Sequence, residues 1–138
     1  MARWLYAISL IGSERKEDAL EVLQAAPEED VPTIRGRLCV FLKLALEGNK
    51  PDAAECVGAE LMSRARKVEW WSWWVAECYA FIDEQELALD WLENAFQCGF
   101  VNYPYLSEHS RIFRNLDGNP RFQELLRKVR IAREQFQL

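Results

Sequence analysis

The sequence predicts an all-α fold built as a stack of helical hairpins, and three observations support this prediction. Half of the 138 residues are hydrophobic, which excludes a disordered chain. Six Gly and five Pro are too few for a sandwich of seven or more β-strands. Apolar residues also recur at a long, nearly constant interval, and a period of about 20–50 residues is typical of repeat proteins. The length fits one domain.

The repeat becomes visible when three alanines are aligned, Ala19, Ala53 and Ala88. Apolar residues nine and twelve positions before each alanine fall into the same register: Leu10, Leu44 and Tyr79, and Ala7, Phe41 and Ala76. Within each period the apolar residues follow helical spacing on both sides of a short polar break. Each period is therefore predicted to be two helices joined by a turn, with a small alanine where the helices approach most closely.

The polar breaks place the turns of these hairpins. They lie at residues 12–14, 48–51 and 83–84. Pro51 follows Asn49 and Lys50, and this order predicts a helix start, because proline suits the first helical turn. Pro120 predicts the start of a last helix in the same way. One face of that helix is apolar and contains Phe122, Leu125, Leu126 and Val129.

The helix expected over residues 70–81 is apolar in nearly every direction. It contains four tryptophans, at positions 70, 71, 73 and 74. A helix that is apolar all round is normally enclosed by other helices. This helix is thus expected to lie inside the stack, with hairpins on both sides.

These residues resemble the tetratricopeptide repeat. The best match is the third period, with Val75, Ala76, Tyr79, Ala88, Leu92 and Ala95 at the motif positions. The first period supplies Tyr6, Ala7, Leu10, Ala19, Leu23 and Ala26. The second is degenerate, because Phe41 occupies a small-residue position and Glu60 replaces the last alanine, so its helices are expected to be splayed or longer than usual. The segment after Gly99 resembles the terminal unit of such arrays in bacterial multidomain regulators and kinases.

The resemblance implies a right-handed α-α superhelix formed by a single domain. Its repeats would cover about residues 1–33, 34–67 and 68–102, and a capping unit would cover residues 103–138. In this family the first helices line a concave groove, which implies these groove residues here: Trp4, Ile8, Ile11, Arg35, Leu38, Leu42, Trp70, Trp73, Glu77 and Phe81. The Lys and Asn residues of the family's chaperone-binding clamp are absent from these positions.

A mostly apolar groove favours a non-catalytic scaffold that binds an apolar or amphipathic peptide or helix. The alternatives are a groove filled by a second copy of the chain, or a regulatory module of a larger signalling protein. A third alternative is RNA or lipid binding through the basic last helix, because residues 107–138 carry seven basic and four acidic side chains. The net charge of −5 argues against nucleic acid as the main partner.

No enzyme, cofactor or metal site is expected. The sequence contains no phosphate-binding glycine loop, nucleophile elbow or zinc-protease motif. His109 is the one histidine, and the four cysteines, which lack CxxC spacing, are expected to be buried, reduced thiols. No apolar run is long enough to span a membrane, and the apolar N-terminal residues lack a signal cleavage site, so a cytoplasmic location is expected.

Overall fold

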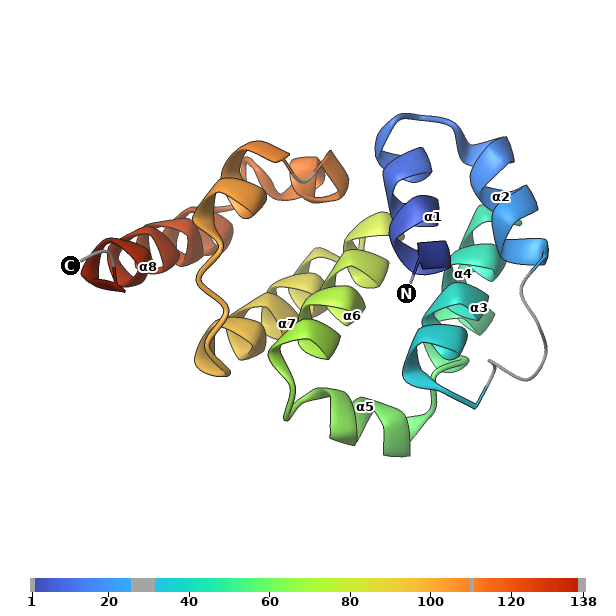
Figure 1. Ribbon diagram of the computed structural model, residues 1–138, viewed down its shortest axis with the longest axis horizontal. Coiled ribbons are helices and arrows are strands. Elements are labelled where there is room, and N and C mark those ends of the chain that lie inside the picture. Colours follow the sequence, from blue (N-terminus) through green and yellow to red (C-terminus); the bar gives the residue numbers. More distant parts are fainter. Residues whose placement is uncertain (1, 26–31, 110, 137–138) are drawn as a thin grey trace. The chain divides into compact units, whose positions relative to one another are not determined.

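The computed structural model describes residues 2–25, 32–109 and 111–136, and every regular element in these ranges is a helix. The predicted all-α class is therefore confirmed for this part of the chain (Figure 1). The chain divides into two compact units, Met1–Arg64 and Ala65–Leu138. Among the described helices none is both long and apolar enough to cross a membrane.

The first unit contains two helical hairpins. Helix α1 (Ala2–Gly12) packs against α2 (Lys16–Gln24), and α3 (Ile34–Leu46) packs against α4 (Lys50–Glu55). Contacts between α2 and α3 join the hairpins. Two of the aligned alanines, Ala19 and Ala53, are completely buried, as expected where helices approach closely. Ala26 of the repeat motif lies outside the described residues.

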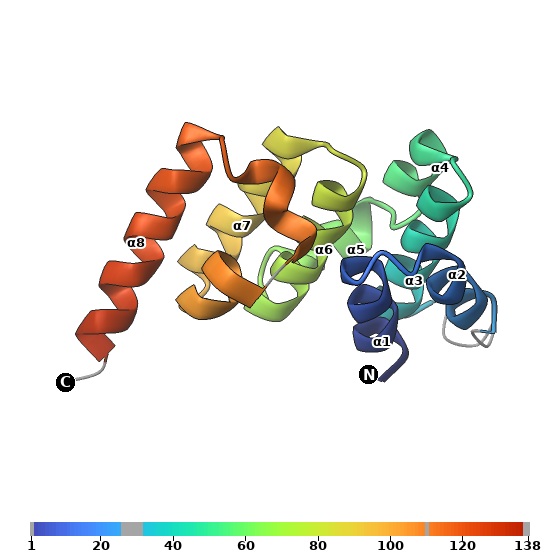
Figure 2. The ribbon, with the colours of Figure 1, turned by 90° about the horizontal axis from the view of Figure 1, so that it is seen from above.

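The second unit is built around the hairpin of α6 (Glu69–Phe81) and α7 (Gln85–Gln97), which lie side by side in Figures 1 and 2. A π-helical turn η2 (Tyr105–His109) and a 3-10 helix η3 (Arg111–Leu116) follow, and η3 packs on α6. The last helix, α8 (Pro120–Phe136), packs against α7 and begins at the predicted proline. Its apolar face is buried through Phe122, Leu125 and Val129.

All three hairpins turn in the same way. At the end of each first helix, an N–H group reaches back five residues to a carbonyl, as in a Schellman motif. The donor and acceptor pairs are Arg15 to Leu10 (2.9 Å), Asn49 to Leu44 (2.9 Å) and Glu84 to Tyr79 (3.0 Å). The acceptors are three residues that the sequence repeat aligns. The residue before each donor has a positive φ: Glu14 (61°), Gly48 (85°) and Asp83 (62°).

The second hairpin is irregular, as expected, but its first helix is not longer than usual. Helices α3 and α6 both have 13 residues, so α3 is not lengthened. Instead the second helix breaks into α4 and a short α5 (Ala59–Ala65). Gly58, at φ +85°, provides the left-handed residue that ends one helix before the next. The Arg37 guanidinium donates a 3.3 Å hydrogen bond to the Cys56 carbonyl, which compensates for the interrupted helix.

Candidate interaction site

Most of the predicted groove residues are buried rather than open to a ligand. Arg35 and Trp70 are exposed, and Ile8 and Phe81 are partly exposed. The other six predicted residues are at most 8% exposed: Trp4, Ile11, Leu38, Leu42, Trp73 and Glu77. The set also divides between the two units, with residues up to Leu42 in the first unit and the remainder in the second. Among the predicted groove residues, the apolar side chains that a partner could contact are therefore Trp70 and, in part, Ile8 and Phe81.

Two aromatic side chains are clearly exposed among the described residues of the second unit: Phe136, 80% exposed at the end of α8, and Trp70, 53% exposed near the start of α6. Of the two, we consider Trp70 further, because it contacts another aromatic ring. Its ring lies 5.9 Å from that of Trp73, one helical turn further along. The ring centre of Trp73 also lies 4.8 Å from that of Phe100 and 4.3 Å from that of Tyr105. The Trp73 and Tyr105 rings meet edge to face. We call Trp70, Trp73, Phe100 and Tyr105 the aromatic cluster. Only its outermost member, Trp70, is exposed; the other rings form a packed support behind it.

A buried carboxyl group lies beneath the aromatic cluster. Glu77 is 2% exposed, and the hydroxyl of Tyr105 donates a 2.9 Å hydrogen bond to its Oε1 atom. Burial raises the pKa of Glu77 to about 8, because an ionised carboxylate is poorly solvated in the interior. The hydrogen bond from Tyr105 opposes that rise in the pKa. Glu77 is therefore largely protonated near neutral pH, and it fixes the π-helical turn to α6.

The buried polar residue Ser72 belongs to a structural network on another side of α6. Its hydroxyl donates to the carbonyl of Ala65 at 2.8 Å. The amide nitrogen of Asn94 on α7 donates to Ser72 Oγ and to the Arg66 carbonyl, both at 2.8 Å. The guanidinium of Arg66 lies 4.1 Å from the ring centre of Trp91. These contacts hold the residues before α6 against the hairpin of α6 and α7. The Ser72 hydroxyl and the Asn94 amide nitrogen are used in these structural hydrogen bonds, so we assign them no role in catalysis.

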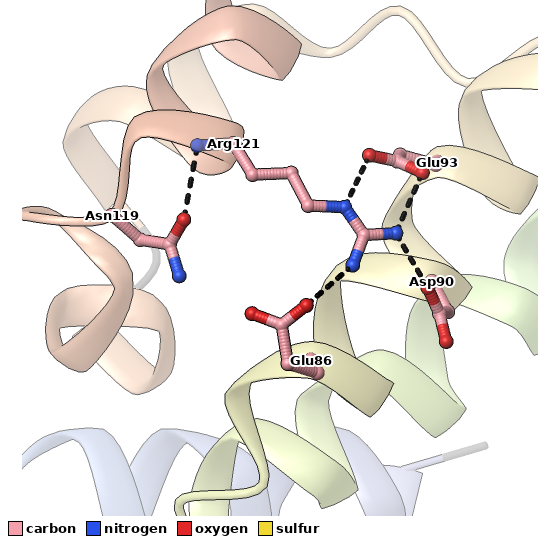
Figure 3. Close-up of polar contacts among 5 residues, drawn as sticks. All are labelled: Glu86, Asp90, Glu93, Asn119 and Arg121. Carbon is pink, nitrogen blue, oxygen red and sulfur yellow. Dashed lines mark hydrogen bonds and ion pairs between the residues drawn. The ribbon is translucent and has the colours of Figure 1, made fainter.

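An arginine joins α8 to α7 through three carboxylates (Figure 3). Arg121 contacts Glu86 at 3.0 Å and Glu93 at 2.8 Å, and it also pairs with Asp90. Glu86, Asp90 and Glu93 share one face of α7 because they are four and three residues apart. The carboxylates hold the pKa of Arg121 above its usual value. Since the guanidinium is occupied on all sides, we assign this cluster to the attachment of α8.

The described residues contain no group of three or more His, Cys, Asp and Glu side chains placed to hold a metal ion. Cys39 and Cys78 are buried, as expected, and Cys56 is partly buried, with burial raising its pKa to about 11. Cys98 is exposed, and the prediction of a buried thiol is wrong there, because this residue caps the end of α7. The side chain of His109 lies outside the described residues.

The resemblance to the tetratricopeptide repeat grouped Trp70, Trp73 and Glu77 as groove residues of one helix, and all three lie on α6. It missed Tyr105 and Phe100, which lie in the segment after α7 and carry no periodic signal that would link them to α6. Comparison of the chain with protein-family models, with curated proteins and with solved structures gave no match in any of the three.

Proposed function

We propose that this protein is a non-catalytic scaffold of the tetratricopeptide type, and that its aromatic cluster binds an apolar or amphipathic helix of a partner protein. The observation that carries the proposal is the half-exposed indole of Trp70 resting on the packed rings behind it. Tryptophan residues are enriched among the side chains that dominate interface energies. A ring already held by its neighbours loses little conformational entropy when a partner covers it.

The equivalent hairpin turns support the repeat interpretation. In the family that the sequence resembles, the position of Trp70 in the third repeat lies in the ligand groove. The first unit offers exposed apolar side chains too, namely Leu5 and Tyr6 of α1, each 54% exposed. Trp70 is the stronger candidate, because its ring contacts Trp73, which is itself packed against Phe100 and Tyr105.

A peptide selection tests this function. The full chain is immobilised, a displayed library of helical peptides is selected on it, and the affinities of the enriched peptides are measured by fluorescence anisotropy. Peptides with an apolar stripe at helical spacing are expected. Trp70→Ala should weaken their binding at least about tenfold, which is the usual range for a hot-spot truncation.

Leu87→Ala is the matched control, because Leu87 is an exposed apolar residue on α7 of the same unit. The affinity of the Leu87→Ala variant for the peptides should stay within about twofold of the wild-type affinity. Equal losses in both variants, or none in Trp70→Ala, would reject the proposed surface. Light scattering of the free chain tests the alternative of self-association: a dimer that Trp70→Ala converts to a monomer would show that a second copy occupies the surface.

A further inference from the structure

We infer that the second unit carries a separate binding site for a small phosphate ester, in a cavity between Tyr103 and α8 that is open to solvent. The cavity has a volume of about 220 Å³. It is lined by Tyr103, Gln123, Leu126, Arg127 and Arg130. It shares no residue with the aromatic cluster, so the inference is independent of the proposed scaffold function.

The cationic side chains of the cavity are positioned by the packing of α8. Gln123, Arg127 and Arg130 are four and three residues apart and therefore lie on one face of the helix. The adjacent face, with Phe122, Leu125 and Val129, is buried. Since that burial fixes the rotation of α8 about its axis, both guanidinium groups are directed to the same side, toward Tyr103.

Hydrogen-bonding capacity remains on the lining side chains. Arg127 donates to Glu124 through Nε at 2.8 Å and Nη2 at 2.7 Å, which leaves its Nη1 group for another acceptor. Arg130 forms no ion pair with any residue in the part of the chain that the structure describes. Gln123 is held in place, because its Nε2 atom donates to the Asp117 carbonyl at 2.6 Å. With Glu124 included, the charged groups here sum to one positive charge.

A phosphate monoester matches this set of donors. Arginine presents a planar fork that pairs with two oxygens of a phosphate group, and a second guanidinium can contact the third oxygen. A carboxylate ligand has two oxygens rather than three, so it would satisfy fewer of these guanidinium donors than a phosphate group does. Half-buried Leu126 supplies an apolar wall against which the carbon chain of an ester can pack.

The size of the cavity limits the ester. At about 220 Å³ it is below the range of roughly 300–1,000 Å³ that is usual for drug-sized ligands. It has room for a phosphate group with a short carbon chain, such as a glycerol phosphate. The same chemistry is presented by a soluble phosphate ester and by the headgroup of phosphatidic acid.

Two probes distinguish these sources in experiments on the full chain. Isothermal titration calorimetry measures binding of sn-glycerol 3-phosphate. Co-sedimentation compares phosphatidylcholine vesicles with and without phosphatidic acid. Saturable binding to either probe is expected, and the probe that binds identifies the source. Arg130→Gln should weaken this binding at least about tenfold, because it removes a charge-assisted hydrogen-bonding group.

Lys128→Gln is the matched control, since it removes the same charge from the same helix. Lys128 is exposed and, at about 100° per residue, it points away from the cavity face. It should change the affinity by less than about twofold. Circular dichroism verifies that each variant is folded, and Arg127→Gln provides a second test of the same cavity. The inference is overturned if neither probe binds, or if Lys128→Gln and Arg130→Gln weaken binding equally, because equal losses would indicate general attraction to positive charge.

Discussion

The hydroxyl of Tyr105 and the carboxyl of Glu77 are joined by a 2.9 Å hydrogen bond across the second unit, 28 residues apart in the sequence. One partner lies in the middle of α6 and the other in the π-helical turn after α7. The bond therefore connects the aromatic cluster to the chain segment that precedes α8. Because the carboxyl is buried, the strength of this connection depends on its protonation.

Glu77→Gln should change how stability depends on pH. The pKa of Glu77 is about 8 in the folded protein and about 4.5 when the group is exposed. The folded state thus binds more protons between these values, so the free energy of unfolding of the wild type should fall as pH rises from about 4.5 to 8. The neutral glutamine removes this dependence. The loss in the wild type should reach a few kcal/mol at most.

Urea unfolding of both proteins at a series of pH values from 5 to 8 measures this effect. The two free energies of unfolding should be similar, within about 1 kcal/mol, near pH 5. The variant should be the more stable one near pH 8. Parallel profiles for the two proteins would show that Glu77 does not titrate in this range.

Arg121→Gln should loosen the attachment of α8 without unfolding the hairpin of α6 and α7. The substitution removes three ion pairs and leaves Glu86, Asp90 and Glu93 repelling one another. These groups are partly exposed, so the cost should be about 1 kcal/mol and should shrink at high salt. Hydrogen exchange at the amides of α8 should accelerate in the variant.

Arg127→Gln is the control for this effect. Arg127 pairs with Glu124 within α8 itself and not with another helix. Its loss should leave the exchange rates of α8 nearly unchanged. If both variants accelerate exchange to the same degree, the ion pairs of Arg121 do not hold α8 to α7.

The equivalent turns predict opposite effects for two substitutions. Glu14 and Gly48 occupy corresponding left-handed positions. Only glycine adopts that conformation without steric cost, so Gly48→Ala should destabilise the protein by about 1 kcal/mol. Glu14→Gly should instead stabilise it by up to about 1 kcal/mol, through relief of the same strain. Thermal unfolding measures the stability change in each variant. If both substitutions stabilise the protein, or both destabilise it, the two turns are not equivalent.

Several features of the fold could be predicted from the sequence because they are local. The spacing of apolar residues revealed the helices, and the aligned alanines revealed the hairpins that bury them. Glu14 and Asp83 adopt the positive φ that Gly48 adopts. Glutamate gives no signal of this conformation in a sequence, and aspartate only favours it weakly. The break of the second hairpin at Gly58 was missed for a related reason, since one glycine in a helical pattern is usually tolerated.

The candidate site depends more strongly on contacts between distant segments. The resemblance to the tetratricopeptide repeat implied both Trp70 and Trp73 as groove residues, and their rings lie 5.9 Å apart. The sequence could not show that Trp73 would be covered, because the rings that cover it come from Phe100 and Tyr105. The Arg121 cluster was missed as well, since its partners lie 28 to 35 residues away on another helix. Burial of this kind is decided by tertiary packing.

The most direct test of the proposed scaffold function follows the indole N–H signals of the ¹⁵N-labelled full chain by NMR while a selected helical peptide is added. The signal of exposed Trp70 should shift and saturate as peptide is added, whereas the signal of buried Trp91, which contacts Arg66, should stay in place. A peptide that binds without moving the Trp70 signal would contradict the proposed scaffold function.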